Sequence, residues 1–190
     1  MAGKARSMLK GERCFLRPYV ETDIERLAEI ANERAIVRWM SQRFPHPYTL
    51  HDAQWWIATV SEESLPNHLA IVVDESLAGG IGLIPREGER SGVAEFGYWL
   101  TPAYWGRGIA TEAARLFVPY AFDVREMRRL EARVDLPNVA SARVLEKSGF
   151  QREGLLRQGA RDRDGNIVDV ALYGLLRAEQ PYEKQLNVSS

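Results

Sequence analysis

The sequence predicts a single α/β domain of the α+β type, with one mixed, mostly antiparallel central sheet of about six or seven strands and about four flanking helices. The chain has 190 residues, enough for one domain with a core but few for two. Apolar residues make up 45% and charged residues 27% of it, as in soluble globular proteins. Segments with the two-residue period of strands alternate with segments of helical period, in the order β-αα-βββ-α-β-α-ββ.

The predicted domain covers residues 11–178, between a flexible N-terminus (residues 1–10) and a C-terminal tail (residues 179–190). The first ten residues are basic but lack the apolar core of a secretory signal, and no apolar run approaches the ~20 residues that span a bilayer. A net charge of −1 gives no general attraction to nucleic acids or acidic membranes. We therefore expect a cytoplasmic protein with neither as a partner.

The first third of the chain predicts one strand and two helices. Residues 13–19 form the strand. Residues 22–25 (Thr-Asp-Ile-Glu) match a capping box, and residues 49–52 (Thr-Leu-His-Asp) carry a second helix start signal. Pro45 and Pro47 lie between the two helices, so that connection cannot be helical.

The rest of the chain predicts a meander and then alternating elements. The three strands of the meander are expected at residues 69–73, 78–84 and 93–100. A helix follows to about residue 122, then a strand at 130–134, a helix at 137–147 closed by Gly149, and two strands at 150–156 and 168–176 joined by an Asp164-Gly165 turn.

A glycine-containing loop precedes the helix that ends near residue 122. Gly106 and Gly108 let a phosphate approach the backbone, where free N–H groups and the helix dipole favour an anion. Arg107 adds positive charge and Thr111 a hydroxyl. The same pattern also fits a tight strand-to-helix turn without a ligand. It lacks the Lys-Ser/Thr of a Walker A loop and the third glycine of a dinucleotide fingerprint.

Four stretches of the sequence match one known family in the same order. They are residues 11–18 (GERCFLRP) followed by Asp23, 94–100 (AEFGYWL), 104–113 (YWGRGIATEA) and 138–150 (NVASARVLEKSGF), and with residues 168–173 the match covers about residues 11–177. The chain resembles the GNAT acetyltransferases, and among them the RimJ/RimL-type N-acetyltransferases. The resemblance implies an enzyme that transfers an acetyl group from acetyl-CoA to a primary amine, by direct attack in a ternary complex.

The resemblance also implies which residues bind acetyl-CoA. The pantetheine would lie in a gap between residues 98–100 and 130–134. Where the family's phosphate motif usually begins with Gln or Arg, this chain has Trp105, and because the contacts are mainly backbone N–H groups we expect binding to survive the change. The implied binding residues are Trp99, Leu100, Trp105, Gly106, Arg107, Gly108, Ile109, Ala110, Thr111, Asn138, Ser141, Arg143 and Lys147.

Two residues are candidates for catalysis. Glu95 is a carboxylate on an otherwise apolar and aromatic strand, which suits a general base; the alternative is a surface charge on an outer strand. Many GNAT enzymes place a Tyr on the later helix as the acid for the thiol, but this chain has Leu145 there. The resemblance then points to Ser141 facing the sulfur. Alternatively, Asn138 caps this helix and Ser141 only serves its first turn.

The favoured acceptor is the α-amino group of a protein or peptide. Its pKa is near 8, against roughly 10.4 for lysine, so a weak base suffices. Bulky rings at residues 38–48 and at Trp55 and Trp56 are expected to line the acceptor side. Two alternatives stay open: a small-molecule amine such as an antibiotic, a toxin or a polyamine, and a non-catalytic acyl-CoA-binding module.

Histidine and cysteine show no metal-ligand spacing, so we expect no metal. Cys14, the one cysteine, reads as a small packing residue rather than a nucleophile. Because members of the resembled family are often dimers, a homodimer is a possible state that the sequence does not test.

Overall fold

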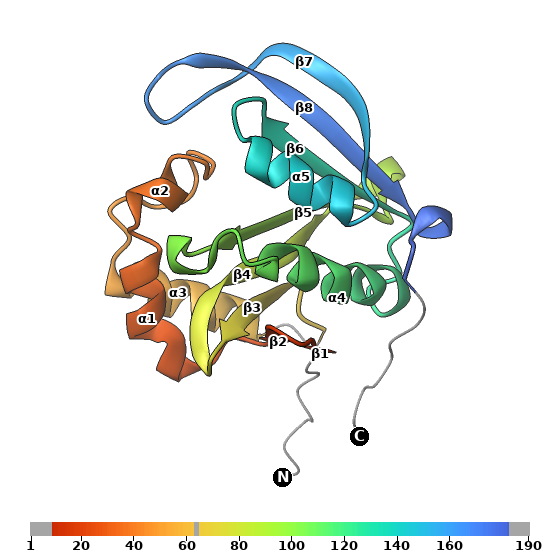
Figure 1. Ribbon diagram of the computed structural model, residues 1–190. Coiled ribbons are helices and arrows are strands. Elements are labelled where there is room, and N and C mark those ends of the chain that lie inside the picture. The colour runs from red at the N-terminus through yellow and green to blue at the C-terminus, as the bar shows by residue number, and fades with distance from the viewer. Residues whose placement is uncertain (1–8, 63–64, 183–190) are drawn as a thin grey trace.

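The computed structural model describes residues 9–62 and 65–182. Within these ranges eight strands form one sheet in the order β1-β2-β3-β4-β5-β6-β8-β7 (Figure 1). Every neighbouring pair is antiparallel except β5 and β6, which run parallel. The strands are β1 (Leu9–Lys10), β2 (Phe15–Arg17), β3 (His68–Val73), β4 (Ser76–Pro85), β5 (Val93–Leu100), β6 (Arg129–Asp135), β7 (Gln151–Arg161) and β8 (Ile167–Leu176).

Helices cover both faces of the sheet, which confirms the predicted fold class. The described α-helices are α1 (Ile24–Ile30), α2 (Arg34–Val37), α3 (Leu50–Ser61), α4 (Ile109–Asp123) and α5 (Val139–Lys147). One hydrophobic cluster joins α4 and α5 to the sheet, and a second joins α1 and α3 to the opposite face. In β3, Leu69 and Ile71 belong to the first cluster while Ala70 and Val72 belong to the second. This strand is therefore buried on both faces and reads as a continuous apolar run.

The structure has one strand and one helix more than the sequence predicted. The extra strand, β1, pairs Leu9 and Lys10 with β2, although both residues lie in the segment predicted to be a flexible N-terminus. Two residues carry no periodic signal, so only the pairing identifies them. The remainder of that segment, residues 1–8, and residues 183–190 lie outside the described residues.

The extra helix arises because the first predicted helix is broken at Asn32. The Asn32 side chain donates to the carbonyl oxygens of Ala28 (2.8 Å) and Tyr48 (2.6 Å) and accepts from the Tyr48 N–H (2.7 Å). A side chain that bonds the backbone in this way competes with helix continuation. It also ties the end of α1 to the loop before α3.

The predicted start of α1 is wrong in detail, whereas the start of α3 is confirmed. Residues 21–23 form a short 3₁₀ helix instead of a cap at Thr22. Asp23 decides this geometry: it accepts the Val20 N–H (2.9 Å) and both terminal nitrogens of Arg17 (2.6 and 2.7 Å). At α3, Thr49 and Asp52 exchange the two bonds of a capping box.

Strands β5 and β6 pair over only three residues and then separate. Val93, Ala94 and Glu95 face Arg129, Leu130 and Glu131, respectively. Beyond this point β5 continues along β4, and β6 pairs only with β8. A wedge-shaped gap therefore opens between residues 96–100 and 132–135. The resemblance implied a gap between residues 98–100 and 130–134, but Leu130 pairs with Ala94 and the gap begins further along β6. Backbone groups on this side of β5 are free of a strand partner, so the gap can accept a ligand with an extended backbone.

Candidate active site

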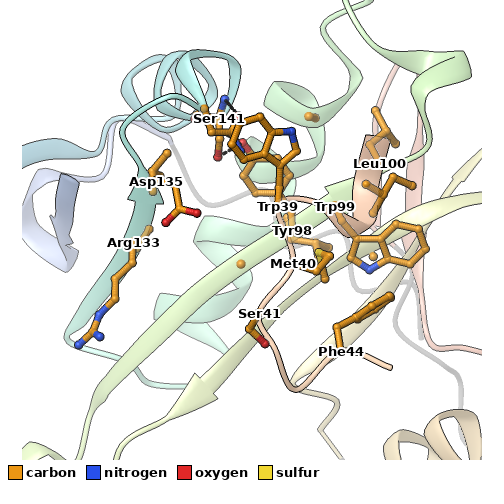
Figure 2. Close-up of a pocket in the computed structure, with 18 of the residues that line it drawn as sticks. Trp39, Met40, Ser41, Phe44, Tyr98, Trp99, Leu100, Arg133, Asp135 and Ser141 are labelled. Atoms are coloured by element: carbon orange, nitrogen blue, oxygen red, sulfur yellow. Dashed lines mark hydrogen bonds between the residues drawn. The ribbon is translucent and has the colours of Figure 1, made fainter. Parts of the chain in front are cut away.

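A cleft of about 1350 Å³ passes through the gap between β5 and β6. On one side its walls are the start of α4 and the exposed face of α5. On the other side they are the loop between α2 and α3, the α3 tryptophans and the tip of the β7–β8 hairpin. Figure 2 shows that Trp99 on β5 and Asp135 on β6 face this cleft from opposite edges of the gap.

The loop before α4 presents bare backbone to one end of the cleft. Gly106 and Gly108 have φ of +74° and +76°, a conformation that other residues rarely adopt, and nothing lies within 4 Å of where a Cβ would stand. Gly108 is the N-cap of α4, and no side chain caps the helix there. The unfilled space and the uncapped helix start fit a phosphate group.

Trp105, which replaces the Gln or Arg of the resembled motif, has a structural role in this loop. Its indole Nε1 donates to the carbonyl oxygen of Leu100 (2.6 Å), which closes the turn between β5 and α4. Arg107 lies with its guanidinium 5.3 Å from the centre of the Tyr104 ring. The loop geometry therefore rests on two aromatic side chains as well as on the glycines.

The structure brings the predicted binding residues together with one exception. Arg107 does not line the cleft and stacks on Tyr104 instead. Twelve of the predicted residues do line it: Trp99, Leu100, Trp105, Gly106, Gly108, Ile109, Ala110, Thr111, Asn138, Ser141, Arg143 and Lys147. Whether these residues contact a cofactor stays a prediction.

The start of α5 is organised by Asn138. Its side-chain oxygen accepts the Ser141 N–H (3.2 Å), so Asn138 is the N-cap that the alternative interpretation expected. The Ser141 hydroxyl lies 3.0 Å from the hydroxyl of Tyr98 on β5 (Figure 2). No role for Tyr98 could be predicted from the sequence, because the partner of a strand residue depends on which helix covers that face.

Glu95 lines the cleft, on the α1/α3 face of the sheet together with Trp99. Its carboxylate is paired: Arg86 donates to Oε2 at 2.5 Å, and both side chains are about one-third exposed. The contact uses Oε2, so Oε1 can still accept a hydrogen bond. Glu95 is thus neither a free surface charge nor an isolated base, and its catalytic role stays a prediction.

The sequence missed Asp135 and Arg133, which line the cleft from β6. Figure 2 shows the Asp135 carboxylate directed toward the other labelled residues. Burial, and then the nearby charge of Asp162, raise the pKa of Asp135. These residues alternate with Ala132 and Val134, which pack in the α4/α5 cluster. Strand alternation thus places Asp135 on the same face as Glu95 and Trp99.

Aromatic and apolar side chains form the mouth opposite α4, as the sequence predicted. Trp39, Met40, Phe44 and Trp99 surround it in Figure 2. Arg163, at the tip of the β7–β8 hairpin, closes one side: its guanidinium donates to the carbonyl oxygens of Met40 (3.1 Å), Ser41 and Phe44 (2.5 Å). Segments 120 residues apart are thereby joined across the mouth.

In the described residues, no cluster of three or more His, Cys, Asp or Glu could hold a metal ion, and no helix is long and apolar enough to cross a membrane. Cys14 is buried, and burial raises the pKa of its thiol to about 12. The thiol therefore stays protonated and is a packing group, not a nucleophile.

A splayed β5–β6 pair, an open helix start and a cleft through the gap define a class of acyl-CoA-dependent transferase. The family model described as "Acetyltransferase (GNAT) domain" matches residues 13–151. The chain belongs to the GNAT acetyltransferase family. It is an N-acetyltransferase of that family, which uses acetyl-CoA as the acetyl donor.

Similar proteins include a putative ribosomal N-acetyltransferase, YdaF of Bacillus subtilis (strain 168), which is 30% identical and aligns over 91% of this chain and 96% of its own. A spermidine N(1)-acetyltransferase of Escherichia coli (strain K12) is 26% identical over 74% of each chain. The structure of Mycobacterium smegmatis RimJ in complex with CoA-disulfide superposes with a TM-score of 0.78, covering 90% of this chain and 85% of that one at 24% identity. This last likeness establishes a shared fold.

Proposed function

We propose that this enzyme acetylates the α-amino group of a peptide or protein, by direct attack of the amine on acetyl-CoA in a ternary complex. The observation that carries the proposal is one cleft that joins the open start of α4 to the aromatic mouth through the β5–β6 gap. The donor can enter from one end and the acceptor from the other. Holding two reactants in line in this way contributes roughly 7–11 kcal/mol to lowering the barrier.

The proposed donor site uses backbone groups at its phosphate end. N–H groups of residues 106–111 would bind the pyrophosphate, because a helix start favours an anion. Arg143 and Lys147 are one turn apart on the cleft-facing side of α5, and both are exposed, so they can add charge near the phosphates. The pantetheine would then extend along Trp99 and Leu100 toward Asn138.

The proposed chemistry places proton acceptor and proton donor on opposite faces of the sheet. Glu95, on the acceptor face, would take the amine proton directly or through water, with Arg86 keeping it oriented. Ser141, on the α5 side, would donate to the leaving sulfur. A backbone N–H near Leu100 would bind the acetyl oxygen as charge develops on it.

Charge at the cleft favours a peptide α-amine over a polyamine, although the relatives include a putative ribosomal and a spermidine enzyme. Four acidic residues of the described chain line the cleft. Asp52 and Asp162 cap their own turns and Glu95 pairs with Arg86, which leaves Asp135. Apart from Arg143 and Lys147, which lie on the donor side, basic side chains still outnumber them there: Arg38, Arg43, Arg133, Arg161 and Arg163. A multiply charged polyamine would be repelled.

A thiol-release assay on the full chain tests the acceptor. The panel holds short peptides with different free N-termini, the same peptides with blocked N-termini and an internal lysine, and spermidine. We expect release with free α-amines and none with the blocked peptides. Release with spermidine alone would move the assignment to a small-molecule enzyme. Cofactor binding without release on any amine would support the non-catalytic alternative. A cytoplasmic location and a homodimer also remain proposals.

A further inference from the structure

Tyr98 lies on the face of β5 that is turned toward the proposed cofactor. The proposed base and the acceptor mouth lie on the opposite face. Ala94, Phe96, Tyr98 and Leu100 alternate with Glu95 and Trp99, and all four belong to the α4/α5 cluster or pack against it. Of these four side chains, Tyr98 alone has a polar atom, and it lines the cleft. Its hydroxyl therefore lies on the side of the gap that faces α5.

The contacts of Tyr98 direct its hydroxyl to one residue. The hydroxyl lies 3.0 Å from the Ser141 Oγ and 3.4 Å from the Ser141 carbonyl oxygen. Ser141 is held from its other end, because its N–H donates to Asn138. The serine hydroxyl thus has a fixed neighbour behind it and the cleft in front of it (Figure 2).

The helix that carries Ser141 offers no phenol of its own. Leu145, one turn further along α5, is buried with 1% of its surface exposed, and its side chain packs in the core. Tyr98 brings a phenol to the same helix from the neighbouring strand. Burial raises the pKa of Tyr98 to about 12, so the phenol stays protonated at neutral pH and remains able to donate.

We propose that Tyr98 and Ser141 form a two-hydroxyl relay that delivers a proton to the sulfur of the leaving thiolate. Tyr98 acts through Ser141 and takes over the task of the tyrosine that α5 lacks. This inference rests on the proposed function, because it assumes that the thioester lies in the β5–β6 gap.

The relay balances protons and electrons without another reagent. As the C–S bond breaks, its electron pair stays on sulfur. Ser141 gives its hydroxyl proton to the sulfur while Tyr98 gives its own to the Ser141 oxygen. The proton that Glu95 took from the amine returns through water to the Tyr98 oxygen. The net change is the transfer of one proton from amine to thiol.

The test compares two Tyr→Phe variants that each remove one hydroxyl bonded to α5. Tyr98→Phe removes the relay hydroxyl. Tyr173→Phe is the matched control, because Tyr173 on β8 bonds Glu146 of the same helix (3.0 Å) and does not line the cleft. We expect Tyr98→Phe to lower kcat on the order of 100-fold with an unchanged Kd for acetyl-CoA, and Tyr173→Phe to retain wild-type kcat.

Ser141→Ala and the double variant Tyr98→Phe/Ser141→Ala complete the test. In a relay the two hydroxyls act as one unit. The kcat of the double variant should therefore be at most about twofold lower than the kcat of the slower single variant. The relay would be overturned if the two decreases in kcat multiply in the double variant. It would also be overturned if the kcat of Tyr98→Phe stays within about twofold of wild type. If Tyr98→Phe fails to fold, a Ser141→Ala enzyme with wild-type kcat overturns it equally. A wild-type enzyme without thiol release would instead refute the proposed function.

Discussion

Two carboxylates, Glu95 and Asp135, line the side of the cleft that we propose for the acceptor, and their surroundings differ. Glu95 is paired with Arg86 and is the one charged residue of β5. Asp135 lies across the gap on β6, where burial and Asp162 raise its pKa. A carboxylate that an arginine holds in place suits proton removal. A partly buried carboxyl with a raised pKa suits a hydrogen bond with the incoming amine.

Replacing Glu95 by Gln should separate catalysis from cofactor binding. We expect kcat to fall at least about 100-fold and the acid limb of the pH–rate profile to flatten, while the Kd for acetyl-CoA is unchanged. Glu131→Gln is the control, because Glu131 faces Glu95 in the strand ladder, pairs with Arg90 and Arg129, and lies outside the cleft. Equal kcat values for the two variants would end the assignment of Glu95.

The Asp135 carboxyl should lower the free energy of unfolding at neutral pH. Its native pKa is raised, so between the unfolded and native pKa values the folded chain binds more protons, and stability falls as pH rises through that window. Asn cannot ionise, so we expect Asp135→Asn to be more stable than wild type near pH 7. The difference should vanish below the unfolded pKa of ~3.9. Urea unfolding between pH 3.5 and 8 measures it; a variant less stable at pH 7 refutes this explanation.

At the residue scale, the sequence predicted what depends on local spacing. Asn138 and Ser141 are three residues apart at a helix start, and that spacing alone fixes their contact. Tyr98 and Asp135 could not be assigned, because their roles depend on which strands separate and which helix covers each face. A tyrosine three residues from a candidate base on the same strand was the available signal.

At the element scale, the β7–β8 hairpin completes the mouth that we propose for the acceptor. Figure 1 shows it arching over the end of the sheet, with its tip directed toward α2. The predicted turn at Asp164 and Gly165 is present, and Asp162 stabilises it by accepting from Asn166. A turn signal predicts the hairpin but not which other segments its tip contacts. The contacts of Arg163 with residues 40–44 depend on two loops that the fold brings together.

Removing the Arg163 side chain should loosen the mouth without affecting the donor site. We expect Arg163→Ala to raise KM for the peptide acceptor about 10-fold, to leave the Kd for acetyl-CoA unchanged, and to speed amide hydrogen exchange in residues 40–44. The reason is the loss of three charge-assisted hydrogen bonds to backbone carbonyls. Arg157→Ala, on the exposed part of β7 outside the cleft, is the control. Unaltered KM and amide hydrogen exchange would show that the contacts of Arg163 with residues 40–44 are dispensable.

At the scale of the whole molecule, one departure from regular pairing creates the site. The sequence predicted strands β2 to β8 and four of the five described α-helices, because each of these elements has its own period. It indicated the gap only through family resemblance, since the point where β5 leaves β6 is fixed by the β6–β8 pairing with the end of the chain. That gap connects the glycine loop before α4 with a mouth built from residues 38–45 and the hairpin.

The most direct measurement is isothermal titration of the chain with acetyl-CoA, comparing wild type with Gly108→Asp. Gly88→Asp is the matched control, because Gly88 also has a positive φ (+63°) and open space around it but lies between β4 and β5. We predict binding by wild type and Gly88→Asp, and at least a 100-fold weaker Kd for a folded Gly108→Asp, whose carboxylate would meet the pyrophosphate. Equal affinity in all three proteins would contradict the placement of the donor at the start of α4.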